Sequence, residues 1–467
     1  MINEHIVNLI ESSLEFIPTA DQKRLIKGVS DFIFDPYSEI FLLKGYAGTG
    51  KTSVVAALVQ SLKKTGINTL MMAPTGRAAK VLSSYANIQA FTIHKKIYRQ
   101  KSIDESTTFA IAPNMYKDTI FIVDEASMIS GSLYEQSIFG SGDLLDDMMS
   151  YIKSGTRCKV IIVGDSAQLP PVGFSLSPAL DTGRLKHYGN CTEVELKEVV
   201  RQTNESGILF NATEIRKQIE TNDIRFPKFT TEGFPDIIPV SGVDLVDTLS
   251  DAYSKYGNDE TIIICRSNKR ANKYNEGIRN RVLCMEDEIV SGDRVMIVKN
   301  NYQSLKDIAE IDFIANGDMA TIRRIKKYYE RYGLHFADMV LEFADYGNIE
   351  IDSKVILDTL SMESASLSAE ANKELFYCLA EDYAHIGNKK ERFRAIKDDP
   401  FFNALQIKFA YAVTCHKSQG GQWECVFLDC PYFAEDNLTF EDLRWFYTAV
   451  TRASKQLYLV NFDKKYF

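Results

Sequence analysis

The chain has 467 residues, enough for roughly three domains at about 150 residues each. Its formal net charge of −9 excludes a protein that is basic over its whole surface, although a local basic groove can still bind nucleic acid. The eight cysteines include no CxxC pair, so we expect reduced core thiols and neither a zinc site nor a disulfide framework. The sequence shows no signal-peptide pattern and no membrane-spanning apolar run, and we expect a cytoplasmic protein.

The first 175 residues contain apolar runs that each end in a polar or Gly-rich turn. They are residues 40–43, 70–73, 120–123 and 160–163. Continuous apolar runs of this length are typical of parallel strands that are buried on both faces. Helical stretches lie between the runs, for example residues 52–64 and 76–85. This alternation predicts a doubly wound α/β domain.

A second set of elements predicts another α/β domain. Its expected strands are residues 261–265, 423–428 and 457–460, and its expected helices are residues 268–279 and 439–450. Residues 287–360 alternate apolar and polar side chains, which predicts a small antiparallel barrel or sheet inserted in this domain. A charged helical arm follows at 364–397, and a smaller insertion at 95–117 interrupts the first domain.

A phosphate-binding loop is predicted at residues 45–52, which fit the pattern G-x-x-x-x-G-K-[ST] between an expected strand and an expected helix. Glycines let the backbone wrap around phosphate oxygens, with free N–H groups and a helix N-terminus facing the anion. Lys51 would reach the β- and γ-phosphates of ATP, and the Thr52 hydroxyl would bind Mg²⁺. The residues expected to hold the nucleotide here are Gly45, Ala47, Gly48, Thr49, Gly50, Lys51, Thr52 and Ser53.

Two acidic residues, Asp124 and Glu125, directly follow the expected strand at 120–123. An acidic pair at a strand end is by itself most often a helix cap. Beside a phosphate loop, Asp124 is expected to hold Mg²⁺ and Glu125 to orient and deprotonate the attacking water.

Further motifs resemble, in order and spacing, those of superfamily 1B helicases of the RecD-like and Dda-like group. They are PTGRAA at 74–79, TIH at 92–94, GDSAQLPPV at 164–172, EVVRQ at 198–202, TCHKSQG at 414–420 and YTAVTRA at 447–453. The resemblance extends from about Thr19 to Ala453. It implies two RecA-like motor domains with ATP between them and DNA across their tops.

The resemblance also implies roles around ATP. Gln168 would sense the γ-phosphate, and Arg201 and Arg452 would act as arginine fingers from the second motor domain. Gln22, with Thr19 nearby, would read the adenine edge, although a Gln early in a helix is more often a surface residue. Gly420 and Gln422 would lie near the ribose; relatives often carry an acidic residue shortly after this glycine, and Gln422 departs from that pattern.

Another set of residues matches segments that line the single-strand channel in this family. They are Pro74, Thr75, Thr92, His94, Thr414, His416 and Lys417. Hydroxyl and ring N–H groups contact phosphates without adding much net charge, which suits an acidic protein. His94 as a strand-end cap, and His416 as a cleft residue that contacts only protein, remain alternatives.

The resemblance implies the following domain boundaries: a first RecA-like motor domain at 1–94 and 118–190, a β-hairpin pin at 95–117, a second RecA-like motor domain at 191–286 and 401–467, and an SH3-like barrel with a helical arm at 287–400. Phe109 is the expected wedge of the pin. The strand at 323–332 mixes basic and aromatic residues, which fits either single-strand binding by stacking or, with slight preference, the solvated face of a barrel strand.

The resemblance implies an ATP- and Mg²⁺-dependent 5′-to-3′ DNA helicase that acts on single-stranded DNA and single-strand/duplex junctions. We expect a bacterial or phage-encoded protein that works as a monomer, with single-stranded-DNA-binding, repair or replication proteins as possible partners. Two alternatives are a translocase that strips proteins from DNA without unwinding and a non-catalytic subunit of a nuclease complex. The pathway, whether repair, recombination or phage replication, is left open by the sequence.

Overall fold

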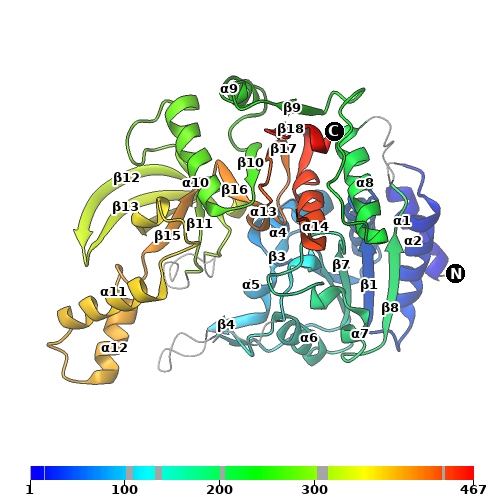
Figure 1. Ribbon diagram of the computed structural model, residues 1–467. Coiled ribbons are helices and arrows are strands. Elements are labelled where there is room, and N and C mark those ends of the chain that lie inside the picture. The colour runs from blue at the N-terminus through cyan, green and yellow to red at the C-terminus, as the bar shows by residue number, and fades with distance from the viewer. Residues whose placement is uncertain are drawn as a thin grey trace.

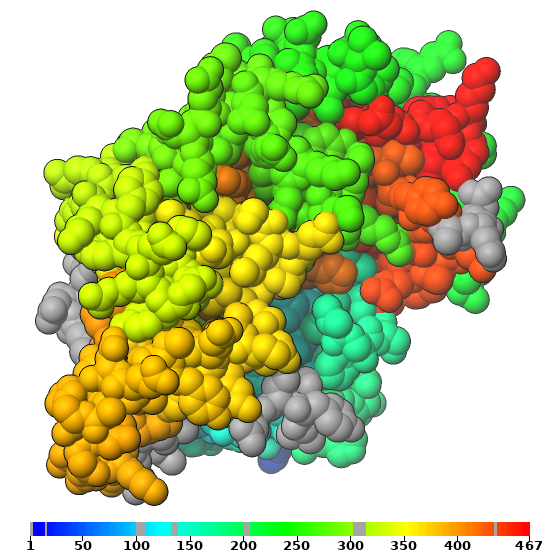
Figure 2. All heavy atoms as spheres, turned by 60° about the vertical axis from the view of Figure 1, so that its left-hand side comes forward, coloured from blue at the N-terminus to red at the C-terminus, as the bar shows by residue number. Residues whose placement is uncertain are grey.

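The computed structural model describes residues 2–14, 16–100, 109–131, 139–199, 206–301, 314–433 and 437–467. Two α/β domains pack against each other, and a barrel with a helical arm extends from the second one (Figure 1). Figure 2 shows the barrel in yellow-green and the arm in orange along one side of the molecule. No helix in these described ranges is long and apolar enough to cross a membrane.

The first domain is built on a parallel sheet in the order β3-β2-β6-β7-β1-β8. Its strands are β1 (Ile40–Gly45), β2 (Asn68–Ala73), β3 (Ala90–Thr92), β6 (Thr119–Val123), β7 (Lys159–Gly164) and β8 (Cys191–Leu196). The four apolar runs of the sequence are β1, β2, β6 and β7, so the prediction of buried parallel strands is confirmed.

Helices cover both faces of this sheet because successive residues of each strand point to opposite sides. Phe41 and Leu43 share a core with α1, α2 and α3, whereas Ile40 and Leu42 share a core with α5 and α6. The helices of this domain are α1 (Ile2–Ser13), α2 (Ala20–Phe34), α3 (Lys51–Lys64), α4 (Gly76–Ala86), α5 (Ile93–Ile97), α6 (Leu144–Ser154) and α7 (Thr182–Leu185), with 3-10 turns η1 (Ala126–Met128) and η2 (Pro178–Leu180).

The second domain has a parallel sheet in the order β16-β10-β17-β18-β9. Its strands are β9 (Ile237–Val240), β10 (Thr261–Cys265), β16 (Ala412–Thr414), β17 (Trp423–Asp429) and β18 (Ala453–Val460). Its helices are α8 (Gly207–Thr221), α9 (Leu245–Tyr256), α10 (Asn268–Gly277) with the π-helical η3 (Ile278–Val282), α13 (Cys415–Ser418), α14 (Phe440–Val450) and the 3-10 turn η7 (Lys464–Tyr466). This sheet also carries a core on each face, and the predicted fold of two RecA-like domains is confirmed.

The insertion in the second domain is a closed five-stranded barrel, as the alternating pattern predicts. It consists of β11 (Arg294–Ile297), β12 (Met319–Arg331), β13 (Leu334–Phe343), β14 (Ile349–Ile356) and β15 (Leu405–Phe409), with 3-10 turns η4 (Ala344–Tyr346) and η5 (Asp358–Leu360). The arm between β14 and β15 is α11 (Ala369–Asp382) and α12 (Lys389–Asp398).

The structure moves two predicted domain boundaries. β8 lies within the range 191–286 that we expected in the second domain, but it pairs with β1 along residues 40–45 and so belongs to the first sheet. β15 lies within 401–467, yet it pairs with β11 and β14 and closes the barrel. In both cases pairing with a distant strand, which no local pattern encodes, decides where the segment belongs.

The small insertion in the first domain is a hairpin of β4 (Tyr98–Gln100) and β5 (Phe109–Ile111), as expected. Its turn, residues 101–108, lies outside the described residues. Phe109 pairs with Gln100 in the pair next to the turn, and its ring centroid lies 4.8 Å from that of Phe139. Its ring is partly buried and packs against the core of the first domain, and the expectation that Phe109 forms the wedge stays a prediction.

Candidate functional site

The phosphate loop connects β1 to α3, as the sequence predicts. Gly48 and Gly50 both adopt φ of +77°, a left-handed conformation that side chains rarely tolerate, and Gly50 is the N-cap of α3. A Cβ added at Gly48 would lie 3.0 Å from a methyl group of Leu209 and 3.1 Å from one of Val199. The loop is thus a tight cradle that opens onto a helix N-terminus and is covered by apolar side chains, a shape that fits nucleotide phosphates.

Lys51 is held inside this loop by its own backbone. Its Nζ donates hydrogen bonds to the carbonyl oxygens of Gly45 at 2.5 Å and Tyr46 at 2.9 Å. The same Nζ lies 3.5 Å from a carboxylate oxygen of Asp165, the residue that follows β7. The cation is therefore preorganised beside the loop, where phosphate oxygens can replace its contacts.

Asp124 and Glu125 lie at the carboxyl end of β6. Burial and the neighbouring Glu125 charge raise the pKa of Asp124, against smaller opposite effects of the Glu125 backbone N–H and of Lys51. Glu125 adopts φ of +53°, a strained conformation of the kind that clusters at functional sites. Two crowded carboxyl groups favour a bound cation, and the oxygens of Asp124 and Thr52 are of the type that Mg²⁺ prefers. These residues fit the expected Mg²⁺ site.

The loop after β7 adds two further polar groups to this site. Asp165 accepts a hydrogen bond from the backbone N–H of Ala167 at 3.0 Å and is almost fully buried. Gln168 is also buried, and its side-chain oxygen has no hydrogen-bond partner in the described part of the chain. An unpaired buried amide oxygen is costly unless a ligand or water uses it. This supports the expectation that Gln168 responds to the nucleotide.

Helix α14 of the second domain closes the site. The backbone N–H of Ala47 donates to the Tyr447 hydroxyl at 2.7 Å, and that hydroxyl donates to Asp165 at 2.9 Å. One residue along, the N–H of Leu169 donates to the Thr448 hydroxyl at 2.8 Å. The two α/β domains therefore meet directly at the phosphate loop.

Of the two predicted arginine fingers, the structure describes only Arg452. Arg201 lies outside the described residues. Arg452 is buried in the second domain, where its guanidinium donates to the carbonyl oxygens of Thr448 and Gly421, both at 3.0 Å. These contacts hold Arg452 within its own domain, so its expected action on ATP requires it to change partners and stays a prediction.

Gln22 is fully buried and anchors the phosphate loop. Its Nε2 donates to the carbonyl oxygen of Thr49 at 2.9 Å, and its Oε1 accepts from the backbone N–H of Thr19 at 3.0 Å. Adenine would compete with the loop for this amide, and its recognition by Gln22 stays a prediction. Gly420 and Gln422 contact α4: a Cβ at Gly420 would lie 3.0 Å from the Thr75 hydroxyl, and the carbonyl oxygen of Gln422 accepts from Arg77.

The residues expected to face DNA follow strand ends in both domains. Thr75, after Pro74, caps α4 and Thr92 caps α5, each through its hydroxyl, so these hydroxyls are already engaged with backbone N–H groups. Thr414 precedes α13 without such a bond, and Lys417 donates from Nζ to Asn316 of the barrel at 2.5 Å. The closeness of Gly420 to Thr75 places the segment after β16 beside the end of β2, where the two domains meet.

The two histidines expected in the channel are partly buried. The His94 ring lies 5.7 Å from Tyr98 and 5.0 Å from Phe139, and burial lowers its pKa to about 4. Burial also lowers the pKa of His416. Both side chains are neutral at pH 7 and can offer a phosphate a hydrogen bond but no charge.

The basic and aromatic strand is β12. Arg323 pairs with Glu342 at 2.7 Å, and Lys326 pairs with Asp352 across the barrel surface. Acidic side chains on β13 and β14 therefore neutralise these cations, which favours the interpretation of β12 as a solvated barrel strand.

Sequence reasoning missed several residues around the phosphate loop. The Arg216 guanidinium lies 4.6 Å from the Tyr46 ring centroid, and the Tyr46 hydroxyl donates to Glu195 at 3.0 Å. Tyr447 stands inside the YTAVTRA motif and Asp165 inside GDSAQLPPV, so the motifs contained both residues. No local signal in the sequence singles out Arg216.

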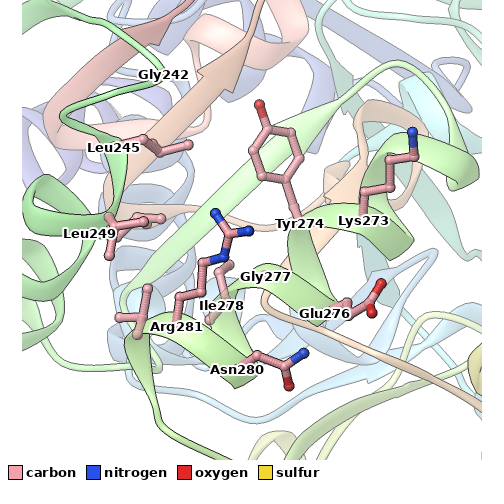
Figure 3. A pocket seen from close by; sticks show the side chains of 12 residues that line it. Gly242, Leu245, Leu249, Lys273, Tyr274, Glu276, Gly277, Ile278, Asn280 and Arg281 are labelled. Carbon is pink, nitrogen blue, oxygen red and sulfur yellow. The ribbon is translucent and has the colours of Figure 1, made fainter.

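A pocket of about 410 Å³ lies elsewhere, between α9 and α10 (Figure 3). Leu245 and Leu249 contribute apolar surface, and the hydroxyl of the lining residue Tyr274 donates to Asp429 of its own domain at 2.5 Å. None of its lining residues belongs to the phosphate loop or follows β6 or β7, so this pocket is separate from the nucleotide site.

Two protein-family models match the chain: an AAA domain over residues 20–226 and a UvrD-like helicase C-terminal domain over residues 409–460. The ATP-dependent DNA helicase dda of Enterobacteria phage T4 is 24% identical over 453 residues, which cover 90% of this chain and 93% of that protein. The RecBCD enzyme subunit RecD of Buchnera aphidicola is 23% identical over 466 residues, which cover 92% of this chain and 71% of that protein.

Among solved structures, the fold is similar to that of a Pif1 helicase, from a structure on DNA unwinding at forked duplex DNA by two coordinating Pif1 helicases. The TM-score is 0.50 at 17% identity, and the aligned region covers 96% of this chain and 94% of the Pif1 chain. This likeness concerns the fold alone. Together the two family matches, the relatives and the motifs support a superfamily 1B DNA helicase of the RecD-like and Dda-like group.

Proposed function

We propose that this chain uses ATP and Mg²⁺ to move 5′ to 3′ along single-stranded DNA and to separate the strands of duplex DNA. The observation that carries the proposal is the contact between Ala47 of the phosphate loop and Tyr447 of the second RecA-like domain. A nucleotide in the loop would lie between two domains that can close and reopen around it.

On the ATP side, the described residues include candidates that would bind the phosphates, the attacking water and the metal ion. Lys51 is held beside the loop and can neutralise charge on the β- and γ-phosphates. Glu125 can accept the proton of the water that attacks the γ-phosphorus, while ADP leaves. Asp124 and Thr52 would hold Mg²⁺, which would supply positive charge to offset that of the phosphates.

On the DNA side, Thr75 of the first domain and Gly420 of the second lie close together at the edge of the cleft. Thr414 and Lys417 lie on the same segment as Gly420, so this edge offers hydroxyl and ammonium groups to a phosphate backbone. Closing and opening the cleft would change the spacing between the two grips, which gives net movement when the grips alternate.

The direction of travel follows the RecD-like and Dda-like group. The described part of the first-domain insertion contains the β4–β5 hairpin, which is suited to act as a wedge at a fork. A translocase that strips proteins from DNA remains the alternative, and the preserved ATP site disfavours a purely structural subunit.

Displacement of streptavidin from biotinylated single-stranded DNA tests translocation without requiring unwinding. A 5′-to-3′ motor displaces streptavidin from a 3′-biotin much faster than from a 5′-biotin, and only with ATP and Mg²⁺. The proposal is overturned by preferential displacement from the 5′ end, or by an ATPase that displaces streptavidin from neither end.

A further inference from the structure

The hydroxyl of Tyr447 occupies a position between the two domains that the function proposed above does not explain. Tyr447 is 1% exposed, and its hydroxyl accepts from the N–H of Ala47 at 2.7 Å while donating to Asp165 at 2.9 Å. Burial raises the pKa of this hydroxyl well above its usual value, so it stays a donor to Asp165. A single hydroxyl therefore joins the phosphate loop to α14.

This hydroxyl competes directly with a nucleotide. Backbone N–H groups of a phosphate loop are the donors that hold phosphate oxygens, and the Ala47 N–H is bound by Tyr447 in this structure. Asp165 faces both Tyr447 and Lys51, at 2.9 and 3.5 Å. When phosphates bind Lys51 and the loop N–H groups, the Tyr447 hydroxyl loses its hydrogen bond from the Ala47 N–H. The charge around Asp165, its other partner, changes because Lys51 now faces the phosphates.

The far side of α14 contacts the segment that is expected to grip DNA. The thiol of Cys415, on the turn next to Thr414, donates to the carbonyl oxygen of Trp445 at 3.6 Å. Arg452, two residues beyond α14, holds the carbonyl oxygen of Gly421 at 3.0 Å. Direct contacts therefore link α14 and the residues just after it to residues 414–421.

We propose that Tyr447 is a positioning residue that couples phosphate occupancy of the loop to the grip on single-stranded DNA. The inference rests on the proposed function, because it assumes that residues 414–421 face DNA. Coupling between two ligands is reciprocal, so nucleotide should change DNA affinity by the same factor by which DNA changes nucleotide affinity.

The test compares single-stranded DNA affinity with and without a non-hydrolysable ATP analogue, in the wild type and in Tyr447→Phe. The Phe ring keeps the packing of α14 and removes only the hydroxyl. We expect the analogue to change the wild-type Kd for DNA by about fivefold or more, within the range usual for allosteric coupling, and to change the Kd of Tyr447→Phe by a factor near one. For each protein, the factor by which DNA changes the Kd for the analogue should equal the factor by which the analogue changes the Kd for DNA.

Tyr411→Phe is a matched control. Tyr411 is also fully buried, and its hydroxyl also accepts from a backbone N–H, of Arg294 at 3.2 Å, and donates to a carboxylate, of Asp293 at 3.0 Å. Those partners lie at the base of the barrel and not at the phosphate loop. This variant should lose a similar amount of stability and keep the wild-type coupling factor.

Equal coupling in the wild type and in Tyr447→Phe overturns the role of Tyr447 and leaves the proposed function intact. A wild-type chain that binds no single-stranded DNA overturns the proposed function itself. Hydrogen–deuterium exchange of the wild type gives a second measurement that does not depend on a folded variant: the analogue should change exchange in residues 440–452 and 414–421 together. Unchanged exchange in both segments contradicts the inference.

Discussion

The ammonium group of Lys51 lies 3.5 Å from the carboxylate of Asp165, although the two residues belong to different strand–loop units of the first sheet. Lys51 follows β1 and Asp165 follows β7, and these two strands are hydrogen-bonded neighbours. The carboxyl ends of these adjacent parallel strands thus place Lys51, the expected phosphate-binding cation, beside Asp165. Asp165 also accepts a hydrogen bond from Tyr447 of the second domain.

Lys51→Ala should abolish DNA-stimulated ATP hydrolysis, with a loss of at least about 10²-fold, because it removes the cation that faces the phosphates. Lys44→Ala is the matched control: its side chain is also 15% exposed and pairs with Glu193 at 2.9 Å on the neighbouring strand. Lys44→Ala should keep near-normal turnover. A folded Lys51→Ala protein with wild-type turnover would show that the loop is not the catalytic site.

Arg452→Ala should bind ATP and single-stranded DNA but lose about 10²-fold or more in the rate of hydrolysis, as other arginine fingers do. Since Arg452 also satisfies the carbonyl oxygens of Thr448 and Gly421, the variant should lose about 1–3 kcal/mol of stability as well. Single-turnover hydrolysis with ATP prebound separates the two effects. A normal rate per bound ATP would mean that Arg452 only holds the second domain together.

His94 makes stability depend on pH in a defined direction. Burial lowers its pKa to about 4, below its ordinary value of about 6.5. Between these values the unfolded chain binds a proton that the folded chain does not, so the contribution of His94 to stability is present above pH 6.5 and is lost as the pH falls toward 4.

Between pH 7 and pH 5, the wild type should therefore lose about 1–2 kcal/mol more of its free energy of unfolding than His94→Gln does. Urea unfolding at the two pH values measures this difference. His335 gives a control of opposite sign, because a hydrogen bond to Asp358 raises its pKa and its contribution is lost as the pH rises. Parallel pH profiles of the wild type and His94→Gln would refute the assignment of a partly buried, neutral His94.

Lys417 should contribute one phosphate contact to single-stranded DNA binding. Each neutralised phosphate adds about 0.7 to the slope of log affinity against log salt concentration on single strands. We expect Lys417→Ala to weaken binding and to reduce that slope by about this amount. Lys326→Ala is the control, because Lys326 on β12 is paired with Asp352 and should leave the slope unchanged. A reduced slope for Lys326→Ala and an unchanged slope for Lys417→Ala would mean that the single-stranded DNA runs over the barrel.

The sequence predicted the strands that are buried on both faces. It did not predict which sheet a strand joins where that depends on pairing with a strand far away in the chain. β1, β2, β6 and β7 have continuous apolar runs because both faces are covered. β8 is an edge strand with Glu193 and Glu195 among its residues, so its sequence lacks the signature of a buried strand. β15 is separated from β14 by the whole arm, and no local pattern links it to the barrel.

In the nucleotide site, too, local motifs could be predicted from the sequence, and contacts between distant segments could not. Local motifs with fixed spacing, such as residues 45–52 and Asp124-Glu125, could be read directly from the sequence. The contacts of Tyr447 and the surroundings of His94 could not, because they depend on Ala47 and Phe139, which are distant in the chain. A tyrosine inside a helix is usually a core residue, and only the fold shows that the hydroxyl of this one reaches the phosphate loop.

Strand displacement on tailed duplexes tests the central claim most directly. Two substrates share one duplex and differ only in whether the single-stranded tail is 5′ or 3′, with ATP and Mg²⁺ present and Lys51→Ala as the inactive control. A 5′-to-3′ helicase unwinds the duplex with the 5′ tail and shows little activity on the 3′ tail. Efficient unwinding from the 3′ tail alone would contradict the account.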